Sequence, residues 1–166
     1  KKKIPSHDFV LSKGHSGLGL YACLSYFKMI SKKKLNSYYQ NGSKLSGHVS
    51  HYDIDGIDFS TGSLGHGLSI GCGLAYGNKL NKNRRLTIVL MSDGECDEGS
   101  VWEAALFASH FKLNNLICVI DYNKIQSLEK VNKTIQLEPF AKKWNSFGWK
   151  VKEIDGHNYN SLFVGL

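Results

Sequence analysis

The hydrophobic and polar positions divide the chain into stretches typical of helices and stretches typical of strands. Five stretches are predicted to be helices, from apolar or small side chains at helical spacing or from helix-start signals. They cover residues 17–30, 35–40, 64–80, 99–111 and 139–147. The third is rich in glycine, which predicts close packing against its neighbours. Pro139 opens the last one, where a missing backbone N–H is tolerated.

Three shorter stretches have the composition of strands. Residues 86–91 and 116–120 are continuous apolar runs, as in strands buried in a parallel sheet, and residues 149–154 alternate. Strands that alternate with helices form right-handed βαβ units, so the sequence predicts an α/β fold, a parallel sheet with helices on both faces. Residues 41–63 are polar and are predicted to be a long loop, which in compact domains is usually functional.

Composition and charge restrict the class of protein. The chain has 166 residues, 42% of them hydrophobic, so residues 1–166 are expected to form one domain. It starts at Lys1 without a methionine and stops at Leu166, so truncation at both ends is expected. The net charge of +7 lies in short runs without interleaved aromatic residues, which argues against a nucleic-acid partner. No apolar run is long enough to predict a membrane span, and four cysteines without C-x-x-C spacing, in apolar or small-residue settings, are expected to be buried free thiols in a reducing cytoplasm.

Two polar side chains follow the two predicted buried strands. Asp93 follows the strand at 86–91, and Asn123 follows the strand at 116–120. Parallel sheets bind ligands where their strands end, so both side chains are expected at one edge. A carboxylate, an amide oxygen and a backbone carbonyl suit Mg²⁺, completed by phosphate oxygens and water, and Gly94 would let a diphosphate approach the backbone. Taken singly, each residue is better explained as a turn residue; the pair, at two strand ends one βαβ unit apart, favours metal binding.

Residues 92–125 resemble the thiamine diphosphate motif of transketolases, which runs from Gly-Asp-Gly to an asparagine one βαβ unit later. The resemblance implies that three groups hold the magnesium ion: the side chains of Asp93 and Asn123 and the carbonyl oxygen of Ile125. It implies that Gly94 and Asn123 contact the cofactor. Glu98 is implied to belong to the cofactor site at a dimer interface, where it helps to couple two active sites.

Four further segments resemble the same family in the same order. They are residues 11–15, 47–48, 60–65 and 155–157. The resemblance implies that His15 contacts the cofactor near its diphosphate and that His48 faces the substrate, so both are candidate catalytic residues. The backbone at Gly62 and Leu64 is expected to hold the rings of the cofactor. The roles of two other histidines stay open, His51 and His66.

The resemblance implies an enzyme that transfers a two-carbon ketol unit from a ketose or its phosphate to an aldose or its phosphate. Its cofactors would be thiamine diphosphate and Mg²⁺. Family members also need a pyrimidine-binding domain, whose glutamate protonates the aminopyrimidine, so this chain alone is expected to be inactive. The expected partner is a C-terminal pyrimidine-binding subunit, in a homodimer or heterotetramer.

Two alternatives to a transketolase stay open at this point. The first is another thiamine diphosphate enzyme, of the deoxyxylulose-phosphate synthase or 2-oxoacid dehydrogenase E1 type. The segment at residues 61–65 and the order Asp121-x-Asn123 favour transketolase over these. The second is a non-catalytic binding protein, for which the basic charge is the one supporting feature.

Overall fold

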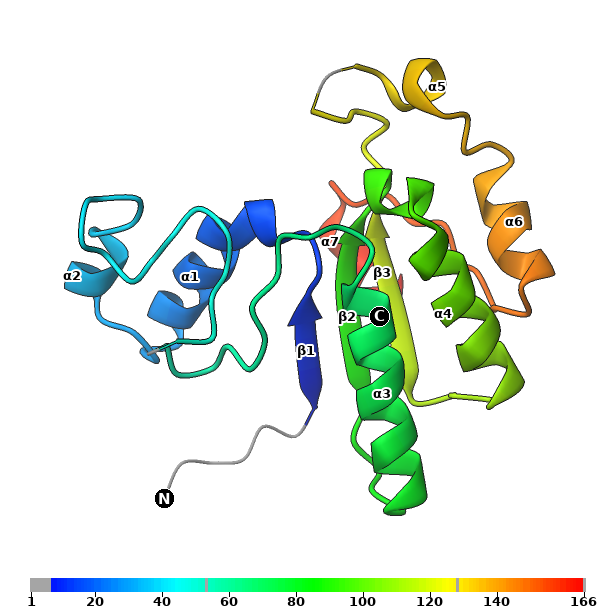
Figure 1. The fold of residues 1–166 in the computed structure, drawn as a ribbon, viewed down its shortest axis with the longest axis horizontal. Coiled ribbons are helices and arrows are strands. Elements are labelled where there is room, and N and C mark those ends of the chain that lie inside the picture. Colours follow the sequence, from blue (N-terminus) through cyan, green and yellow to red (C-terminus); the bar gives the residue numbers. More distant parts are fainter. Residues whose placement is uncertain (1–6, 53, 128, 166) are drawn as a thin grey trace.

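A three-stranded parallel sheet organises the chain. The computed structural model describes residues 7–52, 54–127 and 129–165. The strands are β1 (Asp8–Leu11), β2 (Thr87–Ser92) and β3 (Leu116–Asp121), and they lie in the order β1-β2-β3 (Figure 1). All pairs are parallel, so the three carboxyl ends meet at one edge. The prediction of a parallel α/β fold is confirmed.

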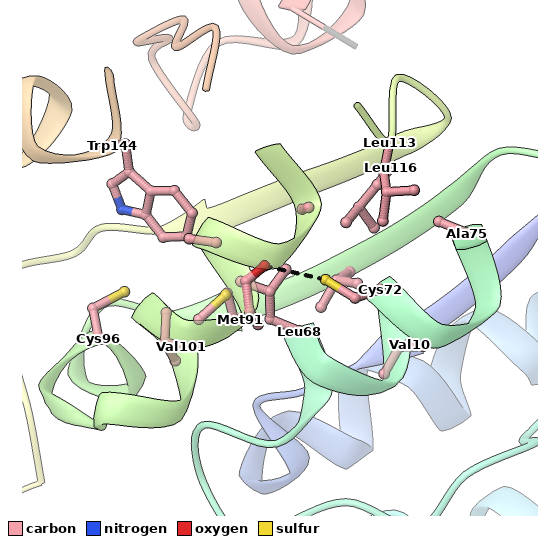
Figure 2. Packing of buried hydrophobic residues seen from close by; sticks show 14 of the residues in the cluster. Val10, Leu68, Cys72, Ala75, Met91, Cys96, Val101, Leu113, Leu116 and Trp144 are labelled. Carbon is pink, nitrogen blue, oxygen red and sulfur yellow. Dashed lines mark hydrogen bonds between the residues drawn. The ribbon is translucent and has the colours of Figure 1, made fainter. Parts of the chain in front are cut away.

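One face of the sheet is covered by two long helices, α3 (Gly67–Leu80) and α4 (Gly99–His110). Val89 and Met91 of β2 point to this face and are fully buried. Figure 2 shows how Met91, Leu68 and Val101 converge between the sheet and these helices. Gly71 lets α3 approach the sheet closely, because a Cβ there would lie 2.3 Å from a methyl carbon of Val89. The glycine-rich helix therefore packs as the sequence predicted.

The opposite face is covered at its carboxyl end by a second, smaller core. Leu11 and Leu90 alternate with the residues that face α3, so they point the other way. They pack against a cluster built from α1 (Gly17–Tyr26), where Tyr21 and Leu24 are buried, and from the long loop that follows. Between residues 36 and 66, the described positions contain no helix or strand, which confirms the predicted loop.

The remaining helices are short. They are the 3₁₀ turns η1 (Gly14–Ser16) and η2 (Gly94–Asp97), and the helices α2 (Lys32–Leu35), α5 (Val131–Thr134), α6 (Phe140–Ser146) and α7 (Tyr159–Gly165). Helix α6 lies against α4, where Trp144 packs on Trp102 with ring centroids 5.3 Å apart. In the part of the chain that the structure describes, no helix is both long and apolar enough to cross a membrane.

Two predictions of local structure are wrong. Residues 149–154 form no strand; Trp149 donates from its indole N–H to the carbonyl of Ala105 at 3.0 Å and packs on the core instead. The third strand is β1, which the sequence prediction missed. Residues 35–40 do not form a helix, because Tyr39 has a φ of 59°; the helical turn lies earlier, in α2. One of the short basic runs, Lys1–Lys3, lies outside the described residues.

Candidate functional site

The side chain of Asp93 lies directly beyond β2, at the carboxyl edge of the sheet. It is 1% exposed. Its Oδ1 accepts the backbone N–H of Gly94 at 2.8 Å, and its Oδ2 accepts that of Lys124 at 2.9 Å. Burial raises the pKa of this carboxyl above its usual value, and the two N–H donors offset the rise only in part. Among the described residues, no ion pair neutralises Asp93, so its charge would be stabilised by a cation brought from outside the chain.

The segment after β3 forms the other half of this arrangement. The bond from Lys124 to Asp93 brings the turn that begins at Asn123 against the Asp93 carboxylate. Asn123 is exposed, and its Oδ1 accepts the backbone N–H of Ile125 at 2.8 Å, which is an Asx-turn. Lys124 has a φ of 65°, so the chain reverses there and leaves Ile125 at the surface. Asn123 is thus a turn residue, as the alternative to metal binding required, and the same turn lies against the Asp93 carboxylate.

The oxygen atoms at this edge suit a magnesium ion. Among the described residues, no group of three or more His, Cys, Asp or Glu side chains is suited to a metal. The set offers instead one buried carboxylate at Asp93, the amide oxygen of Asn123 and the carbonyl of Ile125. Mg²⁺ is usually held by a few protein oxygen atoms, and water and the phosphate oxygens of a ligand complete its coordination.

Glu95 is a second buried carboxylate at this edge, and sequence reasoning missed it. It is 0% exposed and lies in η2. Its Oε1 accepts the backbone N–H of Ser92 at 3.0 Å, and its Oε2 accepts that of Gly65 at 3.1 Å. The hydroxyl of Ser12 also donates to Oε2. No local pattern signals this burial, because two of the three donor residues are distant in the sequence.

An ion pair between a buried lysine and an exposed aspartate links β1 and β3 at the same edge. The Nζ of Lys13 lies 2.6 Å from an Oδ of Asp121, and Lys13 is 8% exposed. Sequence reasoning singled out neither residue as a site residue in its own right. The lysine stands in the segment that carries His15, so the pair fixes that segment to the end of β3.

Three loops that carry predicted cofactor residues touch one another here. A Cβ on Gly14 would lie 2.7 Å from the backbone of Thr61, so the two loops meet backbone to backbone. The Thr61 hydroxyl donates to the carbonyl of Leu11 at 2.7 Å. The ring of His48 lies against Gly62, whose φ of 146° and tight surroundings exclude a side chain. The structure therefore brings the three segments into one place.

The imidazoles of His15 and His48 are both exposed at this junction. Partial burial lowers the pKa of His15 below its usual value of 6.5, and the positive charge of Lys13 lowers it further. Glu95 and Asp121 act in the opposite direction, and His48 adds a small lowering effect.

Leu64 and Glu98 flank the same loop. Leu64 is half-buried, and Gly65 beside it has a φ of 82° with Glu98 so close that a Cβ would lie 2.7 Å from the Glu98 Cβ. The two histidines left open are held by local contacts. His51 Nδ1 lies 2.7 Å from the Ser60 hydroxyl, and His66 Nδ1 lies 3.3 Å from the Ser63 carbonyl.

The chain belongs to the transketolase family. Residues 2–164 match the family model described as "Transketolase, thiamine diphosphate binding domain". The match covers nearly the whole chain, including the sheet edge and the loops described above.

Particular relatives sharpen this assignment. The chain is 42% identical over 161 residues to one of the subunits of apulose-4-phosphate transketolase from Phocaeicola vulgatus, covering 97% of this chain and 57% of that protein. It is 40% identical over 159 residues to 6-deoxy-6-sulfo-D-fructose transketolase subunit SqwG of a Clostridium species, covering 95% and 58%. Human transketolase is 38% identical over 160 residues, covering 95% and 26%.

A solved structure agrees with the sequence relatives. The crystal structure of transketolase from Campylobacter jejuni superposes with a TM-score of 0.90 at 28% identity, covering 96% of this chain and 26% of that one. The predicted resemblance to transketolase is confirmed, and so is the thiamine diphosphate-binding fold. The chain spans a little over half the length of the curated subunits that it matches and about a quarter of the length of human transketolase.

Proposed function

We propose that this chain forms the diphosphate-binding part of a transketolase. It would transfer a two-carbon ketol unit from a ketose phosphate to an aldose phosphate, with thiamine diphosphate and Mg²⁺. The observation that carries this proposal is the bond between Asp93 and the backbone of Lys124, 2.9 Å long. It joins the two halves of the family motif around a buried carboxylate that lacks a cation among the described residues.

Each predicted residue has a place in this proposal. Three groups hold the magnesium ion, namely Asp93, Asn123 and the carbonyl of Ile125. Gly94 presents backbone to the diphosphate, because a side chain there would press on Gln126 at 3.3 Å. The loop with Gly62 and Leu64 supports the rings of the cofactor, and Glu98, which directly precedes α4, lies against Gly65 and supports that loop.

The two histidines would act on the substrate side. Bound thiamine diphosphate supplies the electron sink for breaking the carbon–carbon bond. Because the pKa of His15 is lowered, its imidazole is neutral near pH 7 and can accept or donate one hydrogen bond at each nitrogen. His48 is positioned by its contact with Gly62, and it would orient a hydroxyl or carbonyl oxygen of the sugar.

The proposed partner is a C-terminal pyrimidine-binding subunit. Two relatives are named as transketolase subunits, and this chain spans a little over half of their length. Their printed names refer to apulose 4-phosphate and to a sulfonated fructose, which supports a modified or phosphorylated sugar as substrate. The assembled form would be a homodimer or a heterotetramer. Four free cysteines support a reducing compartment such as the cytoplasm.

Calorimetry on the complete enzyme that contains this chain tests the proposal. Thiamine diphosphate is titrated in the presence and absence of Mg²⁺, and the assembled enzyme is then given xylulose 5-phosphate and ribose 5-phosphate. We expect magnesium-dependent binding and ketol transfer, both lost in Asp93→Ala. Glu153→Gln removes an exposed charge from the segment after α6 and serves as the matched control. Binding that persists in Asp93→Ala would contradict the metal assignment, and consumption of pyruvate would point to the synthase or dehydrogenase type instead.

A further inference from the structure

The carboxylate of Glu95 gathers hydrogen bonds from three separate parts of the chain. Ser12 follows β1, Gly65 ends the loop before α3, and Ser92 is the last residue of β2. All three donate to Glu95, Ser92 through its backbone N–H at 3.0 Å and its hydroxyl at 3.5 Å. These donors are electrically neutral, and Glu95 is fully buried among them. Its bonds therefore connect loops rather than neutralise a cation.

Each connected segment also carries a residue of the proposed cofactor site. Ser12 stands in the segment with His15, and Gly65 closes the loop that contains Gly62. Ser92 is the neighbour of Asp93. The three segments that carry these residues are thus all hydrogen-bonded to one side chain, that of Glu95.

A carboxylate offers an acceptor oxygen to each backbone donor, whereas an amide offers only one acceptor oxygen. Two of the donors to Glu95 are backbone N–H groups, one on each carboxylate oxygen, and a backbone N–H cannot accept a hydrogen bond. An amide in place of the carboxylate would turn one acceptor into an NH₂ group. That group would face either the N–H of Gly65 or the N–H of Ser92, and a donor that faces a donor in a buried place is strongly unfavourable.

We propose that Glu95 is a positioning residue that holds the three loops in the arrangement that binds magnesium thiamine diphosphate. This inference rests on the proposed function. Glu95 touches neither metal nor cofactor in this role; it acts through Ser12, Gly65 and Ser92.

The test compares Glu95→Gln with wild type in the complete enzyme. The substitution keeps the shape of the side chain and removes one acceptor. We expect the Kd for thiamine diphosphate with Mg²⁺ to rise about 10- to 100-fold, the range typical of residues that support metal ligands. Hydrogen exchange in the cofactor-free enzyme should accelerate in residues 12–15, 61–66 and 92–95, while the exchange of β3 and α4 stays unchanged.

A second variant protects the test against a misfolded Glu95→Gln protein. Ser12→Ala removes a single hydroxyl donor and leaves both backbone donors in place. It should weaken cofactor binding less than Glu95→Gln, and the effects of the two substitutions should be less than additive in the double variant, because Ser12 acts through its bond to Glu95. Glu153→Gln again controls for the loss of a carboxylate and should match wild type.

The outcomes separate this inference from the proposed function. Faster exchange confined to the three loops, together with weaker cofactor binding, supports the positioning role. A Glu95→Gln enzyme that binds cofactor within twofold of wild type overturns it, and so does faster exchange spread over the whole sheet, which would mark a general effect on folding. If the wild-type enzyme binds no thiamine diphosphate, the proposed function fails and this inference falls with it.

Discussion

The two ends of the sheet hold buried or half-buried carboxylates in opposite ways. At the amino end, an Oδ of Asp8 lies 2.5 Å from the guanidinium of Arg85, and its other Oδ accepts the side-chain amide of Asn78 at 2.7 Å. At the carboxyl end, Asp93 and Glu95 are more deeply buried, yet they receive hydrogen bonds from N–H and O–H groups that carry no charge.

The difference separates a carboxylate that serves the fold from one that is available to a ligand. Asp8 has its positively charged partner, Arg85, within the chain. Through Arg85 and Asn78 it links α3 to the segment before β2, and its charge needs no further partner. Asp93 retains an excess of negative charge in a place where burial makes charge unfavourable. Open parallel sheets bind ligands at the carboxyl ends of their strands. The carboxylate without a positively charged partner, Asp93, lies at that end, and the paired carboxylate, Asp8, lies at the other.

The largest effect is expected from removing the charge of Asp93. Asp93→Asn should weaken magnesium-dependent binding of thiamine diphosphate by at least about 100-fold, or roughly 3 kcal/mol, because the only charged member of the proposed ligand set is lost. Calorimetry measures the affinity, and urea unfolding of the metal-free protein measures stability. The metal-free variant loses an unfavourable buried charge, but its amide can accept only one of the two backbone N–H groups that Asp93 accepts, so its stability should fall by less than its cofactor affinity. A fall in stability as large as the loss of binding energy would show that Asp93 serves the fold after all.

The reverse result is expected at the other end of the sheet. Asp8→Ala leaves Arg85 and Asn78 without their acceptor, so the free energy of unfolding should fall by about 2 kcal/mol. Urea unfolding measures this change. The affinity for magnesium thiamine diphosphate, measured by calorimetry, should stay the same. A Kd that rises along with the loss of stability would mean that the two ends are coupled.

Two glycines of α3 sharpen the contrast within one helix. A Cβ on Gly67 would lie 2.2 Å from the Ser12 hydroxyl, whereas a Cβ on Gly73 meets nothing within 4 Å. Gly67→Ala should therefore destabilise the protein by about 1 to 2 kcal/mol and weaken cofactor binding. Gly73→Ala should stabilise it by about 0.5 to 1 kcal/mol and leave binding unchanged. Thermal unfolding and calorimetry compare the two, and equal effects would contradict the close packing at Ser12.

The smallest effect is a change in the pKa of His15. Lys13→Met removes the ammonium that lowers this pKa and exposes the imidazole to the full charge of Asp121, which raises it. The pKa of His15 should therefore rise, as followed by the NMR signals of its ring protons and assigned with His15→Gln. Glu153→Gln should leave it unchanged. An unaltered or lower pKa in Lys13→Met would refute the electrostatic account of this edge.

The same shift has a consequence for stability as the pH falls. The folded chain favours the neutral imidazole of His15, because its pKa lies below the usual 6.5. The associated stability is fully present above pH 6.5 and is lost as the pH falls from there through the folded pKa. In Lys13→Met this loss should be smaller, which urea unfolding at a series of pH values would measure.

Most of the sheet could be predicted from the sequence, and the exceptions have physical reasons. The runs that became β2 and β3 are continuous and apolar, and in β2 this composition fits a strand whose two faces contact different cores. Strand β1 has four residues, and its Phe9 is 44% exposed, so its pattern is too short and too mixed to recognise. In residues 149–154, apolar and polar side chains alternate because Trp149 and Val151 pack on the core. This produces the pattern of a strand, although the segment is not part of the sheet.

The proposed site divides in the same way. Asp93 and Asn123 could be predicted because the order of strands along the chain puts them at one edge. Glu95 could not, since its donor Ser12 lies 83 positions away and a glutamate beside a turn is normally solvated. The Lys13–Asp121 pair spans 108 positions and leaves no local trace either. Sequence therefore locates the strand-end residues of the proposed site better than the residues that support them.

The outer side of α1 has a practical use that follows from its composition. Of the four cysteines, all within the described residues, Cys23 is the exposed one; Cys72 and Cys96 are buried and Cys118 is half-buried. A maleimide dye would therefore attach to α1 selectively, without any engineered cysteine. Tyr26 and Phe27 stand close by with their rings 5.3 Å apart, so the dye would sit in an aromatic environment. Its emission would register any surface that comes to cover that helix, which makes the natural thiol a ready optical reporter of assembly.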